Sequence, residues 1–585
     1  MPTQSSPASP PAQRRATMRN RRCRHRIGSG ALAVLAAAAV LLTGCSGIPR
    51  DGAVEAGQSA LPDDNPAPVF LPSKPLKDGS TDAILRGFIE AASSPEGNYA
   101  IAREFLTPDY SSTWEPDAGV TVDDGSGRST TVVDETTMQF SVTPVAEVDA
   151  RGQYSTVDSS SPVPLRYEFA RVGGQWRISE APDGTVIDRN TFREVFSAQA
   201  LYFFDPSFRY LVPDLRWFPR GASAPTKIVK GVLAGPSPWL SGAVATAFPE
   251  GTKLTADAVR VVARDAKVDL NSEALNADRV SLQRMEAQLS RSLPPGLTAT
   301  ITINQNSQDI GEMGSNAPIA NPRVDARALL LRDGKFGFLA ASGAALTPIA
   351  GISEPVAALK PRAVTLSPGQ AMAAVLTDAG VYGVRVGDDP VRLDPRSGLI
   401  APSIDSDGYV WSVPSARPGE LFVYTLAGKA IAVPAPWQEA SSIVSLDVSR
   451  DGTRLLALLR SGTDSLFVVA AIKRDNNAVP VGLGEPVVLS SGAGLPLDAT
   501  WIDELTVGSL IRLPSGEERI VAQQIGGGTT VLESAPGSVS IAGSNTVREL
   551  RALSAGGALQ VQRGVGWQER IDEVVLIATQ QGIAG

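Results

Sequence analysis

The sequence contains almost no histidine or cysteine. Its 585 residues include one His, His25, and two Cys, Cys23 and Cys45. If the first 44 residues are removed, as argued below, no His remains and Cys45 carries the only thiol. This excludes Ser-His-Asp and Cys-His catalysis, zinc sites held by His or Cys, and any disulfide within the mature chain. The mature protein must therefore fold on its hydrophobic cores alone.

Basic residues are fewer than acidic ones. The chain has 53 Lys and Arg against 61 Asp and Glu, a net charge of −8. The first 44 residues hold seven Arg and no acid, so their removal leaves 46 basic residues against 61 acidic ones, a net charge of −15. A chain this acidic is not expected to bind nucleic acid or a bare anionic membrane surface. A nucleotide-binding loop is also missing, because the run Gly526-Gly527-Gly528 is not followed by Lys.

The N-terminal segment has the pattern of an export signal. Seven arginines between Arg14 and Arg26 precede an apolar run, Ala31 to Leu42, and then Thr43-Gly44-Cys45. A basic flank, a short apolar core and a small-residue cleavage site are typical of secretion signals, whereas about 12 apolar residues are too few to cross a bilayer. The form Leu-Thr-Gly-Cys is the pattern of bacterial lipoprotein signals. We therefore expect cleavage between Gly44 and Cys45, a diacylglycerol on Cys45, and a chain held by lipid at the extracytoplasmic face of the cell membrane.

A tether follows the lipidation site. Residues 45–80 show no hydrophobic period and contain six prolines after Cys45. Such a stretch predicts an extended segment that separates the folded part from the membrane. The alternative is an ordered arm that lies on the first domain.

Residues 81–197 predict a small α+β domain. Ile84, Leu85, Phe88 and Ile89 recur at helical spacing, and later runs such as 166–169 and 175–178 alternate with a period of two around the turn Gly173-Gly174. Helices followed by a meander of strands, ending in Gly-Gln-Trp-Arg-Ile, resemble the cone-shaped fold of the nuclear-transport-factor type. Trp176 in that ending is interpreted as a core residue.

Residues 198–304 predict a second α+β domain. A helix is expected over 225–234 and another over 277–293, with strands near 259–263, 267–270 and 298–303. Three motifs occur in order: Val232-Leu233-Ala234-Gly235-Pro236, Pro249-Glu250-Gly251-Thr252 and Val268-Asp269-Leu270. They resemble the GerMN domain, whose pattern has Leu where this chain has Val232. Asp269 is interpreted as a turn-capping carboxylate, with a ligand role as the alternative.

After a polar linker over 305–322, residues 323–585 predict a β-propeller. Glycines of four tight turns, each followed by an apolar strand, are spaced by 35, 39 and 44 residues: Gly334, Gly369, Gly408 and Gly452. These spacings are close to the length of a propeller blade, and two more divergent units are expected near 500–524 and 546–567. We therefore expect about six blades, with a double β-sandwich as the alternative.

No residue set in the propeller region predicts catalysis or metal binding. The turn Asp405-Ser406-Asp407-Gly408 has the alternating oxygens of a calcium loop, but Pro414 stands where that loop requires Glu. Hairpin turn residues are the better interpretation. Catalysis by a pair of carboxylates stays open, but the sequence singles out no pair. We expect no cofactor, no bound metal and no enzymatic activity.

The order of these parts resembles the LpqB family of actinobacterial lipoproteins. The resemblance implies an accessory regulator that binds the extracytoplasmic domain of an MtrB-type sensor histidine kinase and acts on cell-wall homeostasis and division. A tethered lipid agrees with this role, because confinement near a membrane receptor raises the effective concentration. Two alternatives remain: a carboxylate-based hydrolase, and a cell-wall or glycan-binding scaffold. The candidate stacking residues of such a scaffold are Trp217, Trp239, Trp411 and Trp437.

Overall fold

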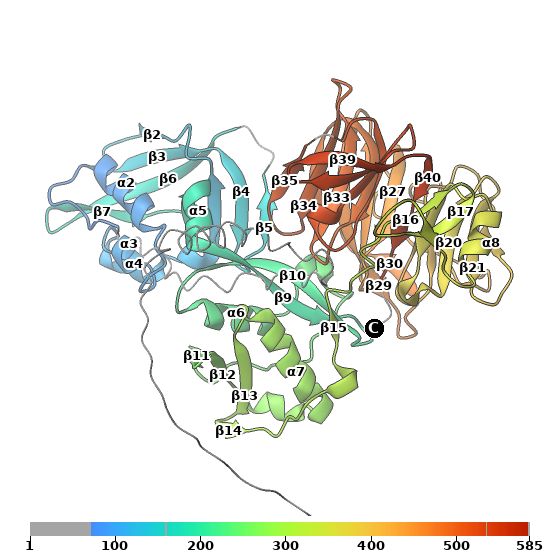
Figure 1. Cartoon of the computed structure of the whole chain (residues 1–585). Helices are drawn as coiled ribbons and strands as arrows, with labels where there is room; N and C mark the ends of the chain where they lie inside the picture. The colour runs from blue at the N-terminus through green and yellow to red at the C-terminus, as the bar shows by residue number, and fades with distance from the viewer. Residues whose placement is uncertain (1–71, 158–160, 534, 583–585) are drawn as a thin grey trace, which may run out of the picture. The chain divides into compact units, whose positions relative to one another are not determined.

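The computed structural model describes residues 72–157, 161–533 and 535–582 (Figure 1). Gly44, Cys45 and the tether up to residue 71 lie outside the described residues. Among the described residues, no helix is long and apolar enough to cross a membrane.

The first domain is α+β. It begins with the helices α2 (Thr81–Ala91), α3 (Ala100–Arg103) and α4 (Pro108–Thr113), and ends with α5 (Arg189–Val195). Two sheets of four strands follow the orders β5-β4-β1-β8 and β2-β3-β6-β7. Their strands are β1 (Gly119–Asp123), β2 (Ser129–Val132), β3 (Thr137–Val142), β4 (Pro144–Asp149), β5 (Tyr154–Thr156), β6 (Val163–Val172), β7 (Gln175–Glu180) and β8 (Thr185–Asp188).

Helix α2 forms where the helical spacing predicted it. The hydroxyl of Ser80 accepts the backbone N–H of Ala83 at 3.2 Å and so caps the helix start. Its apolar face, with Leu85 and Phe88, packs into a core that also holds Trp114 and Tyr167. Residues 72–80, the end of the predicted tether, lie against this domain, since Lys74 Nζ is 2.8 Å from Glu104 Oε1 and Asp78 exchanges two hydrogen bonds with Gln175.

The second domain combines a long hairpin, two helices and a mixed sheet. Strands β9 (Phe196–Phe204) and β10 (Tyr210–Pro219) pair antiparallel. Helices α6 (Ala224–Leu233) and α7 (Arg279–Ser292) lie close to the expected ranges. The remaining strands run in the order β11-β12-β13-β14, and they are β11 (Arg260–Val262), β12 (Asp265–Leu270), β13 (Thr298–Ile303) and β14 (Asn306–Ser307).

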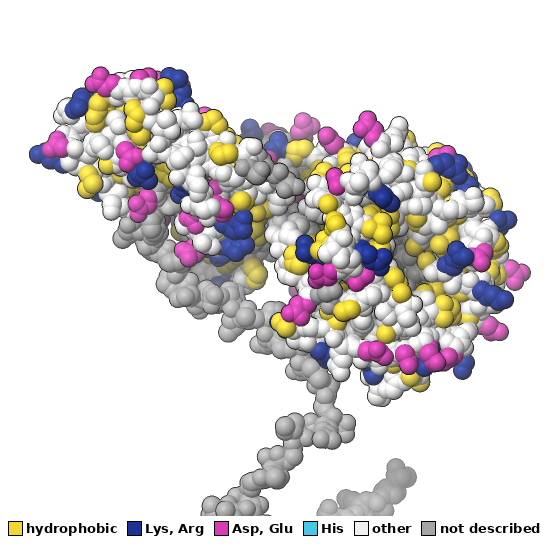
Figure 2. Space-filling view, turned by 90° about the horizontal axis from the view of Figure 1, so that it is seen from above, with side chains coloured by type: hydrophobic (Ala, Val, Ile, Leu, Met, Phe, Trp, Pro, Cys, Tyr) yellow, Lys and Arg dark blue, Asp and Glu magenta, His cyan; other side chains and the backbone are white. Residues whose placement is uncertain are grey.

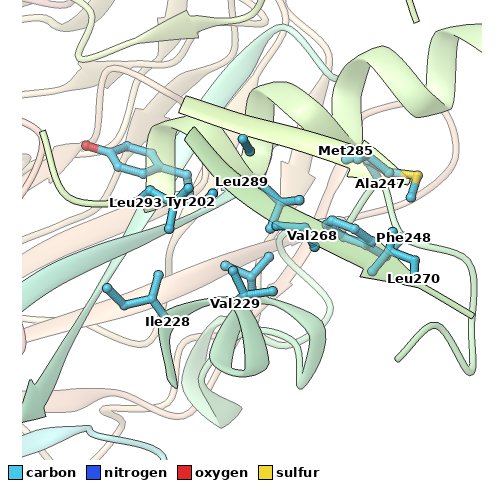
Figure 3. Packing of buried hydrophobic residues seen from close by; sticks show 14 of the residues in the cluster. Tyr202, Ile228, Val229, Ala247, Phe248, Val268, Leu270, Met285, Leu289 and Leu293 are labelled. Atoms are coloured by element: carbon cyan, nitrogen blue, oxygen red, sulfur yellow. The ribbon is translucent and has the colours of Figure 1, made fainter. Parts of the chain in front are cut away.

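The core of this domain lies between its helices and strands. Figure 3 shows Ile228 and Val229 of α6 facing Leu289 of α7 and Leu293, the residue that follows this helix. The hydroxyl of Tyr202 points away from this cluster (Figure 3), which leaves it available for a contact elsewhere. Beyond the domain, the linker predicted over 305–322 contributes β14 and a further strand, β15 (Ile319–Ala320), which pairs parallel with β10. The backbone N–H of Ile319 donates to the carbonyl of Arg209 at 2.8 Å, which joins this part of a polar stretch to the sheet.

The C-terminal region consists of six sheets within the described residues, one per blade, as expected. Their strand orders are β18-β17-β16-β40, β22-β21-β20-β19-β41, β23-β24-β25-β26, β27-β28-β29-β30 with β31 on β29, β32-β33-β34-β35 and β36-β37-β38-β39. The strands of blades one to three are β16 (Leu329–Arg332), β17 (Lys335–Leu339), β18 (Leu346–Thr347), β19 (Ala363–Leu366), β20 (Met372–Thr377), β21 (Gly380–Arg385), β22 (Val391–Asp394), β23 (Ser403–Ile404), β24 (Val410–Ser412), β25 (Phe422–Tyr424) and β26 (Ala430–Ala432). Those of blades four to six, with the C-terminal strands, are β27 (Ser442–Val448), β28 (Arg454–Ser461), β29 (Asp464–Arg474), β30 (Pro480–Leu483), β31 (Val487–Ala493), β32 (Leu495–Trp501), β33 (Thr506–Arg512), β34 (Glu518–Gln524), β35 (Thr529–Leu532), β36 (Ser538–Ala542), β37 (Arg551–Ser554), β38 (Leu559–Arg563), β39 (Gly566–Ile571), β40 (Val574–Ile577) and β41 (Thr579–Gln580). A short helix, α8 (Ser353–Ala358), joins the first two blades.

The blades close into a ring. The innermost strands contact one another in the order β40, β19, β23, β27, β32 and β36, and β36 contacts β40 again. Strand β40 lies near the C-terminus and pairs with β16. It therefore supplies the innermost strand of the first blade. This closed ring excludes the double β-sandwich.

Ring closure also corrects the blade repeat that was inferred from the spacing of the four glycines. Gly369, Gly408 and Gly452 lie in equivalent turns, between the first and second strands of their blades, and have φ of 71°, 85° and 74°. Gly334 lies between the second and third strands of blade one, because β40 supplies the first strand there. The spacing of 35 residues is therefore not a blade-to-blade repeat, whereas 39 and 44 are.

Candidate functional site

One face of the propeller is occupied by the second domain. The hydroxyl of Tyr202 donates to Glu504 Oε1 at 2.9 Å, Arg209 Nη2 lies 3.1 Å from Asp407 Oδ1, and Trp217 Nε1 donates to the carbonyl of Gly526 at 2.9 Å. The propeller partners all lie in loops that join first to second or third to fourth strands. We call the face formed by these loops the docked face.

Glu504 is the buried acid of this contact. Burial raises the pKa of its carboxyl, while the Tyr202 hydroxyl and Arg291, at 3.8 Å, favour the ionised form. Among the described residues, Oε2 of Glu504 has no hydrogen-bond partner. The carboxylate is thus held at one oxygen by the second domain.

The opposite face consists of loops joining second to third strands, and of connections between blades. Arg362 and Asp378 form an ion pair there, with side chains 69% and 78% exposed. A cavity of about 260 Å³ runs along the innermost strands, and its lining includes Arg362, Pro402, Val539 and Val575. Val539 and Val575 are 38% and 62% exposed and follow loops of the opposite face, which places the mouth of the channel on that face.

Two aspartates line the channel. Asp447 accepts hydrogen bonds from the Ser403 hydroxyl at 3.1 Å and from the Gln581 amide at 3.0 Å, and burial raises its pKa to about 6. Asp498 accepts the backbone N–H groups of Ala499 at 2.8 Å and Ile541 at 2.9 Å, and burial raises its pKa to about 7. Each carboxyl accepts a hydrogen bond from a neighbouring blade, so these bonds link consecutive blades of the ring.

Of the residues singled out in the sequence, those that the structure describes lie apart from the channel. The lipidation site Cys45, with Gly44, is outside the described residues. Asp269 accepts the hydroxyls of Thr255 and Thr302, the second at 2.6 Å, and the backbone N–H of Gln305 at 2.7 Å. These bonds hold the pKa of Asp269 below its usual value against partial burial. Asp269 therefore acts as a structural carboxylate that caps the turn after residue 303.

The acidic turn at 405–408 is built into the hairpin. Asp405 accepts the backbone N–H of Tyr409 at 2.9 Å and the Trp411 indole N–H at 3.0 Å, and its Oδ2 lies 2.7 Å from Arg474. Groups of three or more Asp, Glu, His or Cys able to hold a metal ion do not occur among the described residues. The turn joins neighbouring strands and blades.

The four tryptophans proposed for stacking have different surroundings. Trp411 and Trp437 are buried in the core of blades three and four. Trp217 packs between Tyr154 and Phe192 of the first domain, with ring centroids 5.5 and 4.9 Å away, while its indole bonds the propeller. Trp217 and Trp239, both half-buried, each line a cleft, of about 360 and about 400 Å³ respectively.

Comparison with known proteins follows the same three-part division. Residues 74–193 match the family model "Lipoprotein LpqB, N-terminal domain", and residues 337–575 match "Lipoprotein LpqB beta-propeller domain". Residues 200–306 match "Sporulation and spore germination", the GerMN domain. The chain belongs to the LpqB lipoprotein family. The family resemblance and the fold class expected from the sequence, two α+β domains followed by a propeller, are confirmed.

Relatives with the name Lipoprotein LpqB extend over nearly the whole chain. The LpqB of Mycolicibacterium smegmatis is 26% identical over 579 residues, covering 90% of this chain and 95% of that protein. The LpqB of Streptomyces avermitilis is 24% identical, with 92% and 95% covered. The LpqB of Cutibacterium acnes is 35% identical, but the match spans only 39% of either chain. These relatives are named as lipoproteins and not as enzymes.

Comparison with solved structures also finds a partial match. The TolB of Acinetobacter baumannii matches with 14% sequence identity and a TM-score of 0.32, covering 43% of this chain and 65% of TolB.

Proposed function

We propose that this protein is an extracytoplasmic regulator, held to the cell membrane by a lipid on Cys45, that binds the ectodomain of an MtrB-type sensor kinase. Membership of the LpqB family supports the proposal, together with the lipoprotein signal at 42–45. A kinase in the same membrane would meet the anchored chain at a high effective concentration, so a weak interface would suffice.

The opposite face of the propeller is the surface we assign to this partner. The observation that carries this assignment is the position of the second domain, whose contacts with Asp407, Glu504 and Gly526 use the docked face. The loops of the opposite face are fixed at both ends by strands, and rigid, loop-lined surfaces suit protein recognition. Over the surface seen in Figure 2, side chains of both charges are interspersed with apolar ones.

Crosslinking and pull-down from membranes of the native host test the proposal. The kinase ectodomain should be recovered with the wild-type chain and lost with Cys45→Ala, while Cys23→Ala, within the segment expected to be removed, leaves recovery unchanged. Deleting 323–585 should leave export intact and weaken the association. Equal recovery of the kinase with that deletion would rule out a propeller interface.

A charge reversal locates the interface more closely. Arg362→Glu, at a side chain 69% exposed on the opposite face, should lower kinase recovery severalfold. Arg86→Glu, 64% exposed on the first domain, is the matched control and should leave recovery unchanged. The reverse pattern would move the interface to the first domain.

A further inference from the structure

A cleft of about 400 Å³ lies where residues of all three domains meet. Tyr154 and Gln153 of the first domain, Trp239 of the GerMN domain and Glu485 of the propeller line it. A volume of this size is within the range of small-molecule sites. The cleft is separate from the opposite face and from the propeller channel, so its role goes beyond the proposed function.

The lining has an unusual composition. It contains two aromatic side chains, Tyr154 and Trp239, together with the exposed carboxylates of Asp149 and Glu485 and the side chains of Gln153 and Ser155. None of the lining residues is Lys, Arg or His. Without a cation, the cleft does not suit a phosphate or another anion.

The walls of the cleft are fixed before any ligand arrives. Tyr154 packs on Trp217, whose indole N–H donates to Gly526, another lining residue. Asp149 Oδ1 accepts the backbone N–H groups of Arg151 and Gln153, both at 2.8 Å, which orients the carboxylate. Trp239 packs against the apolar core of blades four and five. Groups held in this way lose little entropy on binding.

From these observations we propose that the cleft binds a pyranose unit of a polysaccharide. The C–H faces of a sugar ring are apolar and stack on aromatic rings, which Trp239 and Tyr154 offer. Sugar hydroxyls are both donors and acceptors, and the cleft supplies acceptors in Asp149 and Glu485 and donors in Gln153 and Ser155. An ammonium group offers donors only and would make no use of the donors of Gln153 and Ser155.

Binding is tested on the full-length chain, purified in a detergent without a sugar headgroup. Chitotriose, cellotriose and maltotriose are the probes, and saturation-transfer NMR measures their binding. At least one probe should bind saturably, and Trp239→Ala should weaken it at least tenfold. Trp176→Ala, at a half-buried tryptophan of the first domain, is the matched control and should bind like the wild type.

Two further variants distinguish a loss of binding from a folding defect caused by Trp239→Ala. Gln153→Ala and Glu485→Gln change only polar groups at the edge of the cleft and should each weaken the same probe severalfold. The proposal is overturned if no probe binds saturably, or if all three cleft variants bind like the wild type. It is also overturned if tetramethylammonium alone binds in a Trp239-dependent way, because that result assigns the cleft to a cation.

Discussion

At the level of single residues, the propeller channel is lined by two carboxyl groups with raised pKa values, Asp447 and Asp498. Asp498 accepts two backbone N–H groups, yet burial raises its pKa from 3.8 to about 7. Between these values the folded chain holds a proton that the unfolded chain has released. The contribution of Asp498 to the free energy of unfolding therefore falls as pH rises through this window, by at most about 1.4 kcal/mol per pH unit.

Replacing this carboxyl should change the pH dependence of stability. Asp498→Asn removes the titration, so its free energy of unfolding should fall less steeply between pH 5 and pH 7 than that of the wild type. Urea titrations at pH 5, 6, 7 and 8 measure the difference. Asp378→Asn, at a side chain 78% exposed, is the control and should follow the wild type. Parallel curves for Asp498→Asn and the wild type would contradict the expectation.

A second residue-scale prediction concerns the buried ion pair of the GerMN domain. Arg216 Nη2 lies 2.7 Å from Asp214 Oδ2, with side chains 1% and 3% exposed. Removing one partner leaves a buried charge without its counterion, which costs about 3–5 kcal/mol. Arg216→Ala should lower the free energy of unfolding by that amount, as measured by urea titration.

The exposed pair of Arg86 and Asp82 is the comparison. Its side chains are 64% and 44% exposed at a separation of 2.8 Å, and such pairs contribute about 0–1 kcal/mol. A loss for Arg216→Ala no larger than that for Arg86→Ala would show that the buried pair does not stabilise the domain.

At the level of elements, strand β40 decides whether the ring is closed. Leu331 of β16 pairs with Leu576, which is buried. Leu576→Pro removes a backbone N–H from this strand and should open blade one, because proline is not tolerated inside a sheet. Limited proteolysis should then cleave the propeller within minutes, while Val575→Ala, at a neighbour 62% exposed, should resist cleavage like the wild type. Equal resistance of both variants would show that β40 is dispensable.

The same strand shows where sequence reasoning succeeds and where it stops. Helix α2 and the β6–β7 hairpin follow from local spacing and turn residues, and so do the turns at Gly369, Gly408 and Gly452. The pairing of β40 with β16 joins residues more than two hundred positions apart, and no local pattern encodes it. For this reason the spacing of 35 residues between Gly334 and Gly369, which the glycine pattern predicted as a blade repeat, is not one.

The residues of the candidate sites also divide into those that the sequence marked and those that only the fold identifies. Trp239 was marked by its residue type, but its partners in the cleft, Tyr154 and Glu485, come from other domains and only the fold brings them together. Asp447 and Asp498 carried no signal, because each lies in an ordinary apolar strand. The calcium-loop spacing of oxygens occurs instead at the turn of Asp405. The carboxylate there accepts hydrogen bonds from its own hairpin and from Arg474.

At the level of the whole molecule, Glu504 links the GerMN domain to the propeller. Glu504→Ala removes the acceptor of the Tyr202 hydroxyl and the counterion of Arg291. Hydrogen exchange should then rise in both partner segments, around 202 and around 291, with the inner strands of the propeller unchanged. Glu517→Ala, in an exposed loop on the opposite face of the same blade, is the control. Unchanged exchange around 202 and 291 in Glu504→Ala would show that this contact does not hold the two domains.

The closure of blade one by β40 also determines when, during synthesis, the propeller can be completed. A ribosome makes residues 329–347 more than two hundred residues before it makes 574–577. Until β40 has been made, β16 has an unpaired edge, and an exposed edge can pair with other chains. Each newly made molecule therefore passes through a period, ended only when β40 has been made and paired, in which it depends on being kept apart from its neighbours.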